Sequence, residues 1–320
     1  ALKTLDAGAE GYNVAIGLQA GKLMTTGTGN TLLGGEAGES LTSGISNEAF
    51  GRKALKNSTT SSYNTAIGTE ALTTNILSNR NVAIGFQSLF TQNTASLTDS
   101  YNTAVGFKAG TLMTTGTGNT LIGGLAGDAI TTGLYNVAVG YGALTTNIDG
   151  YSNTAIGYES LMSMEPAGGH SYNTALGYRS GRLISTGVQN TLIGALAGDA
   201  LTTGAENVAI GHLALSTEDT GGRNIAIGLG SLQNLNYDGQ AYNIAIGYEA
   251  GNDLSTGINN TIIGGNAGDA LNTGSYNTAL GYNTLGAATI AISNVAIGAF
   301  SLRDNVDGNK NTAVGVQTLM

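Results

Sequence analysis

The stretch Asn64-Thr65-Ala66-Ile67-Gly68 recurs, with small changes, from one end of the 320-residue chain to the other. Successive copies are 17 residues apart in fourteen of the seventeen gaps, and a Gly always lies four places after the Asn. A fixed period of this length is typical of solenoid proteins, in which each repeat packs only on its neighbours. The repeated Asn residues are Asn13, Asn30, Asn47, Asn64, Asn81, Asn102, Asn119, Asn136, Asn153, Asn173, Asn190, Asn207, Asn224, Asn243, Asn260, Asn277, Asn294 and Asn311.

The alternation within each copy has a period of two, which predicts a short β-strand. We expect Thr65 and Ile67 to face the interior of the coil, and Asn64, Ala66 and Gly68 to form a small outer face. Strands gain little from Ala and Gly, so a small face favours close approach by another backbone. The sequence therefore predicts a seam between chains at the glycines, among them Gly17, Gly68, Gly106, Gly140, Gly177, Gly211, Gly247 and Gly281.

The residues after each Gly predict a second short strand that adds one aliphatic side chain to the interior, such as Leu72, Leu112 or Ile130. Ordering one coil costs about 1–2 kcal/mol per residue, so neighbouring coils must supply ladder hydrogen bonds and Asn-on-Asn stacking. We predict an all-β chain, a parallel β-solenoid or β-roll of about 18 coils. Residues 1–11 are a lead-in segment, and residues 12–320 are a single repeat domain whose last repeat is truncated.

Three gaps are longer than 17 residues, and they follow the coils that begin at Asn81, Asn153 and Asn224. The extra residues lie near 90–100, 162–171 and 233–241. Repeat proteins concentrate insertions on one face, which is often the binding face. We therefore expect recognition of a receptor at these loops, with candidate residues Asp99, Met164, Glu165, His170, Tyr237 and Asp238.

A second recurring feature is a coil in which Leu or Ile replaces the Ala and an acidic residue follows nine places after the Asn. The acids are Glu39, Asp128, Asp199 and Asp269. None of these coils holds more than two acidic residues, whereas calcium requires six to eight oxygen ligands, so we expect turn capping or ion pairing instead. Lys22 and Arg182 lie one coil before Glu39 and Asp199 and are the expected partners.

Composition excludes several classes of function. The net charge of −9 leaves no basic surface for nucleic acid. The chain has no Cys, only two His residues (His170 and His212) in different coils, and no run of about 18 apolar residues. No Ser, His and carboxylate share equivalent coil positions, so a catalytic triad has no support. We expect no enzyme activity, no cofactor, no metal bound within a chain and no membrane insertion, while a cation on the axis of a trimer, ringed by three copies of an acid, stays an alternative.

The stretch Asn81-Val82-Ala83-Ile84-Gly85-Phe86-Gln87-Ser88 closely resembles the head repeat of trimeric autotransporter adhesins of the YadA type, and similar arrays occur in phage tail fibres. The resemblance covers residues 13–319. It implies a left-handed parallel β-roll, three rolls packed about a common axis, and adhesion to a surface ligand. The repeat is longer than in the usual adhesin head, and no neck, stalk or anchor motif is visible.

Aromatic residues next to the motif favour phage tail fibres over autotransporter adhesins as the closer resemblance. Tyr before the Asn (Tyr12, Tyr63, Tyr101, Tyr172, Tyr242) and Tyr after the Gly (Tyr141, Tyr158, Tyr178, Tyr248, Tyr282) resemble phage fibres more closely. These tyrosines are expected to stack along the coils or to form a sugar-binding stripe. We therefore expect a segment of a trimeric phage tail fibre or similar virion appendage, with a host-surface glycan or protein as receptor and flanking fibre segments or capping subunits as further partners.

Two alternatives remain open. The chain could be the head of a bacterial trimeric autotransporter adhesin, on an extracellular cell surface. It could also be an ice-binding solenoid, although the adjacent threonines Thr114-Thr115 do not form the double outward ladder that this function needs.

Overall fold

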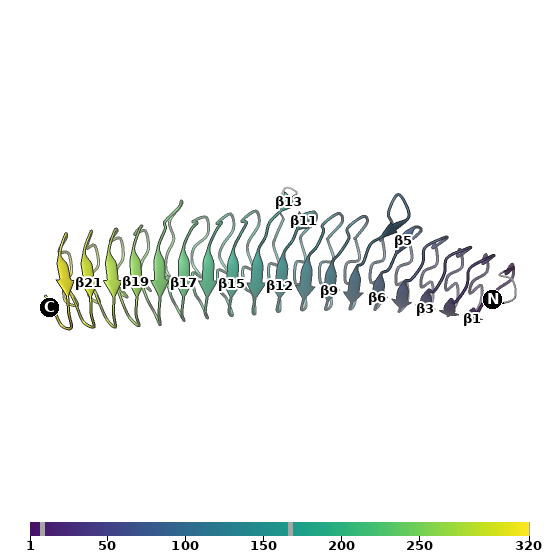
Figure 1. The fold of residues 1–320 in the computed structure, drawn as a ribbon, viewed down its shortest axis with the longest axis horizontal. Coiled ribbons are helices and arrows are strands. Elements are labelled where there is room, and N and C mark those ends of the chain that lie inside the picture. Colours follow the sequence, from purple (N-terminus) through teal and green to yellow (C-terminus); the bar gives the residue numbers. More distant parts are fainter. Residues whose placement is uncertain (7–9, 166–168, 320) are drawn as a thin grey trace. The chain divides into compact units, whose positions relative to one another are not determined.

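The structure is a computed structural model that describes residues 1–6, 10–165 and 169–319. Its contacts divide the chain into two compact units, residues 1–156 with 165–170, and residues 157–164 with those from 171 onward. Each unit is a parallel β-solenoid: one short strand per coil pairs with the strands of the coils before and after it (Figure 1). The main ladder has 18 strands, and the described residues contain no helix. The predicted β-solenoid of about 18 coils is confirmed.

The ladder strands of the first unit are β1 (Val14–Ile16), β2 (Thr31–Leu33), β3 (Glu48–Phe50), β4 (Thr65–Ile67), β6 (Val82–Ile84), β8 (Thr103–Val105), β9 (Thr120–Ile122), β10 (Val137–Val139) and β12 (Thr154–Ile156). Those of the second unit are β14 (Thr174–Leu176), β15 (Thr191–Ile193), β16 (Val208–Ile210), β17 (Ile225–Ile227), β18 (Ile244–Ile246), β19 (Thr261–Ile263), β20 (Thr278–Leu280), β21 (Val295–Ile297) and β22 (Thr312–Val314). Four two-residue strands complete the set: β5 (Ser78–Asn79), β7 (Thr98–Asp99), β11 (Gly150–Tyr151) and β13 (Gly169–His170).

The predicted Asn-on-Asn stacking is present as a hydrogen-bonded ladder, but it lies inside the coils and not on the expected outer face. Asn190 is fully buried, and its Oδ1 accepts from both the backbone N–H (3.0 Å) and the Nδ2 (3.2 Å) of Asn207. The Nδ2 of Asn190 donates to Asn173 Oδ1 (3.1 Å) and to the Gly204 carbonyl (2.9 Å). One side chain thus joins three coils and satisfies a buried carbonyl, which backbone pairing alone leaves without a partner.

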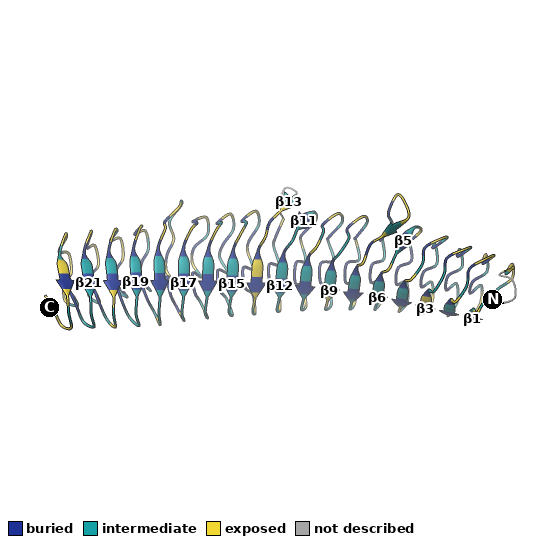
Figure 2. Cartoon of the chain, viewed as in Figure 1, coloured by how far each residue is buried: buried dark blue, intermediate teal, exposed yellow. Residues whose placement is uncertain are grey.

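The predicted facing of the strands is wrong. Asn64 and Ala66 are fully buried, whereas Ile67 is 39% exposed and Thr65 is half-buried. Figure 2 shows the same pattern in many other strands, with a buried residue between two more exposed ones. The interior of each coil is so narrow that Ala is the usual strand residue that fits, and the β-branched rows lie on the outside.

The segment after the Gly is a series of turns and not the expected second strand. Glu70 (φ +62°) and Leu72 (φ +48°) lie in the left-handed region, which a strand cannot include. The aliphatic contribution to the core is nevertheless as predicted for Leu72 and Ile130, which are fully buried. Leu112 is 50% exposed, and Met113 fills the interior instead.

The glycine four places after each Asn is required within the chain. Gly68 has φ +132°, and a Cβ added to it would lie 2.5 Å from the carbonyl oxygen of Gly85 in the next coil. The same steric conflict recurs at Gly17, Gly106, Gly177, Gly211, Gly247 and Gly281. Close packing of successive coils therefore explains these glycines, including their positive φ. A seam between chains at Gly140 and its equivalents stays a prediction. It was based on a small strand face that points outward, and the Asn and Ala of that face lie inside the coil.

Two core positions complement each other in volume. Where the strand carries Leu121 instead of Ala, the residue eight places after the Asn is Gly in the same coil (Gly127) and in the coil before it (Gly110). A Cβ at either glycine would lie within 2.8 Å of a Leu121 methyl group. Leu32, Leu192 and Ile262 have glycines at the same two positions, and the ten coils outside these four pairs combine Ala with Leu. The coil interior is therefore filled to a constant volume, as close packing requires.

Candidate binding surface

Each insertion ends with a short second ladder beside the main one. β5 pairs with β7 in the first insertion, β11 with β13 in the second, and Gly222 with Gln240 in the third. In Figure 1 the loop beside the β5 label, which lies between β6 and β7 in the chain, extends beyond the turns of the neighbouring coils. In each case the pairing joins the residue two places before one repeated Asn to the residue three places before the next. The three insertions therefore bring together equivalent residues of the repeat.

The first insertion brings together Asp99 and Arg80. Asp99 is exposed, and its carboxylate accepts from Asn79 Nδ2 (3.1 Å), Arg80 Nε (3.0 Å) and the Tyr101 hydroxyl (3.4 Å). The Asn79 amide and the Arg80 guanidinium hold the pKa of Asp99 below its usual range. Arg80 also lies over the ring of Tyr63, 4.8 Å from its centroid. The predicted residue Asp99 is thus part of an organised polar cluster.

The second insertion places His170 in the equivalent position. His170 is exposed, and its Nδ1 lies 3.2 Å from the hydroxyl of Ser152. Its ring meets that of Tyr151 edge to face, with centroids 5.6 Å apart.

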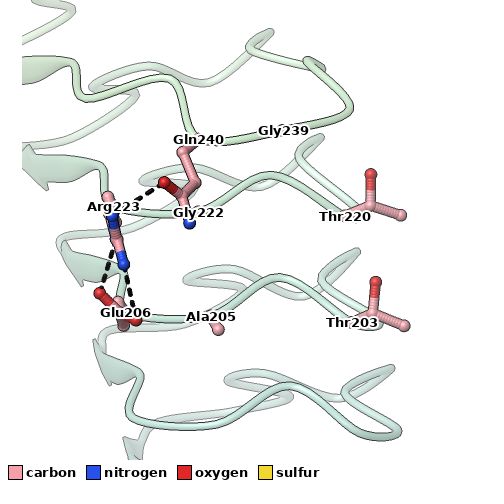
Figure 3. Close-up of a pocket in the computed structure, with 8 residues that line it drawn as sticks. All are labelled: Thr203, Ala205, Glu206, Thr220, Gly222, Arg223, Gly239 and Gln240. Atoms are coloured by element: carbon pink, nitrogen blue, oxygen red, sulfur yellow. Dashed lines mark hydrogen bonds and ion pairs between the residues drawn. The ribbon is translucent and has the colours of Figure 1, made fainter.

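The third insertion is organised around Arg223. Its Nε donates to Glu206 Oε2 (2.7 Å), and its Nη1 donates to Gln240 Oε1 (2.8 Å) and to the Tyr242 hydroxyl (2.5 Å). Figure 3 shows Arg223 between Glu206 and Gln240, along one side of a recess. The Glu206 carboxylate is the main cause that raises the pKa of Arg223. Arg223, Glu206 and Gln240 were not among the predicted site residues.

The three clusters join the same two repeat positions, which can be identified in the sequence. The residue just before the Asn bonds to the residue three places before the next Asn, as in Arg80–Asp99, Ser152–His170 and Arg223–Gln240. Asp99 and His170 were predicted, but Gln240 was missed. Gln240 could have been predicted from its position, because Asp99, His170 and Gln240 each stand three places before the repeated Asn that follows the insertion.

The other predicted recognition residues have different environments. Met164 is fully buried and fills the core position eleven places after Asn153, so its prediction as a receptor contact is wrong. Glu165 and Asp238 are exposed, and Tyr237 is half-buried. Asp238 accepts a hydrogen bond from the Thr220 hydroxyl (2.9 Å), and the Tyr237 backbone N–H donates to Glu218 (3.2 Å).

A buried polar side chain forms a hydrogen bond within the coil that precedes each coil with an insertion. Asn75, Asn147 and Glu218 occupy the same interior position, eleven places after the repeated Asn, and all are buried. Each accepts a hydrogen bond from the backbone N–H three residues later, at Ser78, Gly150 and Gly221. Aliphatic residues occupy this position in most coils, but Ser58, Gln92 and Asn305 are polar there as well, so this position alone does not locate the insertions.

Glu218 is the one member of this set that carries a titratable group. Burial raises the pKa of its carboxyl, and the N–H groups of Gly221 and Tyr237 offset this only in part. Because the folded pKa lies above the unfolded value of about 4.3, ionised Glu218 destabilises the fold. Its contribution to stability therefore increases as pH falls through the raised pKa, and levels off below the unfolded value.

We predict that Glu218→Asn removes this dependence. Asn147 shows that Asn at this position can accept from the N–H (2.8 Å) and donate to the carbonyl (3.3 Å) of the same residue, Gly150. Thermal unfolding of the wild type and the variant between pH 4 and pH 8 measures the difference. The variant should be the more stable protein near pH 7, and the gap should close on acidification. A gap that is independent of pH would contradict the assignment to Glu218.

Aromatic residues stack between coils on the outer surface. Tyr158 and Tyr178 have parallel rings with centroids 5.5 Å apart, and Phe86 and Phe107 stack at 5.6 Å. The tyrosines before the Asn are also exposed, for example Tyr101 at 60%. Stacking along the coils is confirmed for these pairs, and a sugar-binding stripe stays a prediction.

The recurring acids have two kinds of environment. Glu39 forms the predicted ion pair with Lys22 (3.4 Å) and a second one with Lys56 (3.6 Å). Arg182 and Asp199 form no ion pair, and the buried Nε of Arg182 has no hydrogen-bond partner. Burial raises the pKa of Asp128, Asp199 and Asp269.

Threonines line up between successive coils on the ladder strands and also at the turn of Thr114, whose hydroxyl donates to the Thr131 carbonyl (3.2 Å). Thr103 pairs with Thr120, and both are half-buried on the outer face. The neighbouring outer row is made of aliphatic residues such as Val105 and Ile122. On the strands, threonine thus forms part of one outward row beside an aliphatic row, and ice binding stays an alternative.

Three further observations complete the description. The described residues contain no group of three His, Asp or Glu side chains that could hold a metal ion. No helix in the same residues is long and apolar enough to cross a bilayer. Comparisons of the chain with protein-family models, curated proteins and solved structures found no match.

Proposed function

We propose that this chain is a structural and adhesive segment of a homotrimeric fibre, carried on a phage tail or a similar virion appendage, and that it binds a receptor on the host surface. The observation that carries the proposal is the outer face of the main ladder. There the β-branched and aliphatic residues of successive coils stand in register, as in Val208, Ile225 and Ile244. The head-repeat resemblance of residues 13–319 supports the same function and equally supports a bacterial adhesin head.

The outer ladder face suits contact between identical chains. Ile16 (59%), Leu176 (44%) and Leu280 (44%) expose apolar surface in both units. The rows continue from coil to coil, so the apolar surface is contiguous within each unit, and contiguous apolar patches mark interaction sites. A repeated apolar surface of this kind fits a symmetric oligomer. We place the contact between chains on this face, in place of the glycine seam.

Charged substitutions on this face test the proposal. Ile67→Glu with Ile122→Glu should convert the trimer to single chains, because each carboxylate would be desolvated in the contact. The fold should tolerate them, since Glu48 already occupies the outer face of β3. The mass in solution, measured by light scattering, reports the result. Leu112→Glu, on an exposed turn, is the control and should leave the trimer intact. A wild-type chain that is monomeric at micromolar concentration would refute the proposal.

Receptor recognition is assigned to the insertions. Their clusters place exposed charged, amide and aromatic groups side by side, at Asp99, His170 and Gln240. The regular coils position these groups but leave the insertions free to vary, which is the usual division between scaffold and binding loops.

A further inference from the structure

The surface beside the third insertion has a recess that arises from small residues. Ala205 and Gly222 stand two places before successive repeated Asn residues, where Val188 stands one coil earlier. Ile45, Leu134, Ile258 and Ile292 occupy the same position in other coils. The loss of these side chains leaves a recess of about 160 Å³, with Ala205 and Gly222 as its floor (Figure 3).

Polar groups form both sides of this recess. Glu206, Arg223 and Gln240 lie along one side, and the side chains of Thr203 and Thr220 lie along the other (Figure 3). The Arg223 hydrogen bonds to Glu206 and Gln240 fix both acceptors in place before any ligand arrives. Preorganised groups of this kind lose little entropy on binding.

The charge and size of the recess restrict its ligand. Arg223 is already paired with Glu206, and Asp238 adds a carboxylate that accepts from Thr220, so an anion gains nothing here. Hydroxyl groups can donate to the Glu206 and Gln240 oxygens and exchange hydrogen bonds with the threonines. The recess is smaller than the roughly 300–1,000 Å³ of sites for drug-sized molecules. Its volume therefore favours one small polyhydroxylated ring.

We propose that this recess binds a single neutral pyranose unit of a surface glycan. The proposal rests on the adhesive function above and names the ligand class of the third insertion. Glu206 and Gln240 accept from neighbouring ring hydroxyls, Thr203 and Thr220 contact the opposite edge, and the sugar C–H face lies on Ala205 and Gly222.

The test uses the full-length chain and three neutral sugars, the methyl glycosides of glucose, galactose and mannose. Saturation-transfer NMR titrations should show saturable binding of at least one of them, with a Kd of about 1 mM for so shallow a site. Ala205→Ile fills the recess with a side chain that other coils carry at this position, and it should weaken binding at least about tenfold. Glu206→Gln, which matches Gln189 one coil earlier, should weaken binding by about threefold to tenfold.

A matched control variant tests whether the loss of sugar binding is specific to the recess, and the oligomeric state tests the fibre proposal separately. Thr117→Ile makes a comparable change at the same coil position of another coil and should leave binding unchanged. Absence of saturable binding by all three sugars, or equal binding by wild type and Ala205→Ile, would overturn the proposal. Light scattering on the same samples distinguishes this from failure of the fibre proposal. A trimer that binds no sugar overturns only the recess, and a monomer that binds sugar overturns only the fibre.

Discussion

Gly264→Ala is expected to disrupt the second unit, although it adds only one methyl group. Gly264 has φ +139°, and a Cβ there would lie 2.6 Å from the carbonyl carbon of Gly281 and closer still to its oxygen. The backbone conformation alone costs an L-residue about 1–3 kcal/mol, and relief of the contact requires two coils to separate. Because each coil is stabilised mainly by its neighbours, loss of one contact weakens the ladder on both sides. We expect a loss of at least about 4 kcal/mol in unfolding free energy.

Gly265→Ala is the matched control for this prediction. The adjacent glycine has ordinary backbone geometry, and a Cβ there would make only van der Waals contact with the Tyr282 ring, at 3.6 Å. Its stability should stay within about 0.5 kcal/mol of the wild type. Circular dichroism melts measure both variants, and hydrogen exchange should show lost protection in β18–β20 for Gly264→Ala alone. Equal melting of the two variants would contradict the steric role of the glycine row.

The repeat predicted which residues share a face but not which face is inside. A period of two assigns Asn64, Ala66 and Gly68 to one side whatever the packing. The usual rule that large apolar residues lie inside failed because Leu72, after the strand, already fills the interior beside Ala66, and because Asn64 has backbone groups to satisfy. Leu121 with Gly110 and Gly127 contained the missing information, since compensating volumes show that both positions share one core.

The binding surface was predicted in part for a similar reason. Unequal spacings located the insertions and with them Asp99 and His170, which the structure places in equivalent clusters. Met164 failed because it continues the core rows of its coil and belongs to the interior. Arg223 and Ala205 could not be found from the insertion alone. The recess exists because Ala205 and Gly222 are smaller than the residues at the same position in other coils, such as Val188. Comparing these positions requires knowing which residues of successive coils stack on one another.

Asn190→Leu should be strongly destabilising, as should the same change at the other buried Asn residues of the ladder in the second unit. The substitution keeps the approximate size of the side chain but removes the acceptor for the Asn207 N–H (3.0 Å) and the donor to the Gly204 carbonyl (2.9 Å). Each buried group left without a partner costs about 1–3 kcal/mol, so the expected loss is about 2–6 kcal/mol. Asn236→Leu is the control, because Asn236 is exposed and should change stability by less than about 0.5 kcal/mol.

Asn190→Asp distinguishes hydrogen bonding from shape in the same position. The carboxylate retains the acceptor for Asn207 but brings a charge into a fully buried site and loses the donor. Burial should raise the folded pKa of the new carboxyl above its unfolded value, so stability should recover as pH falls and the group becomes a neutral O–H donor. The Leu variant should show no such recovery. Chemical denaturation at pH 4 and pH 7 measures both, and parallel pH behaviour of the Asp and Leu variants would mean that the Asn ladder acts by packing alone.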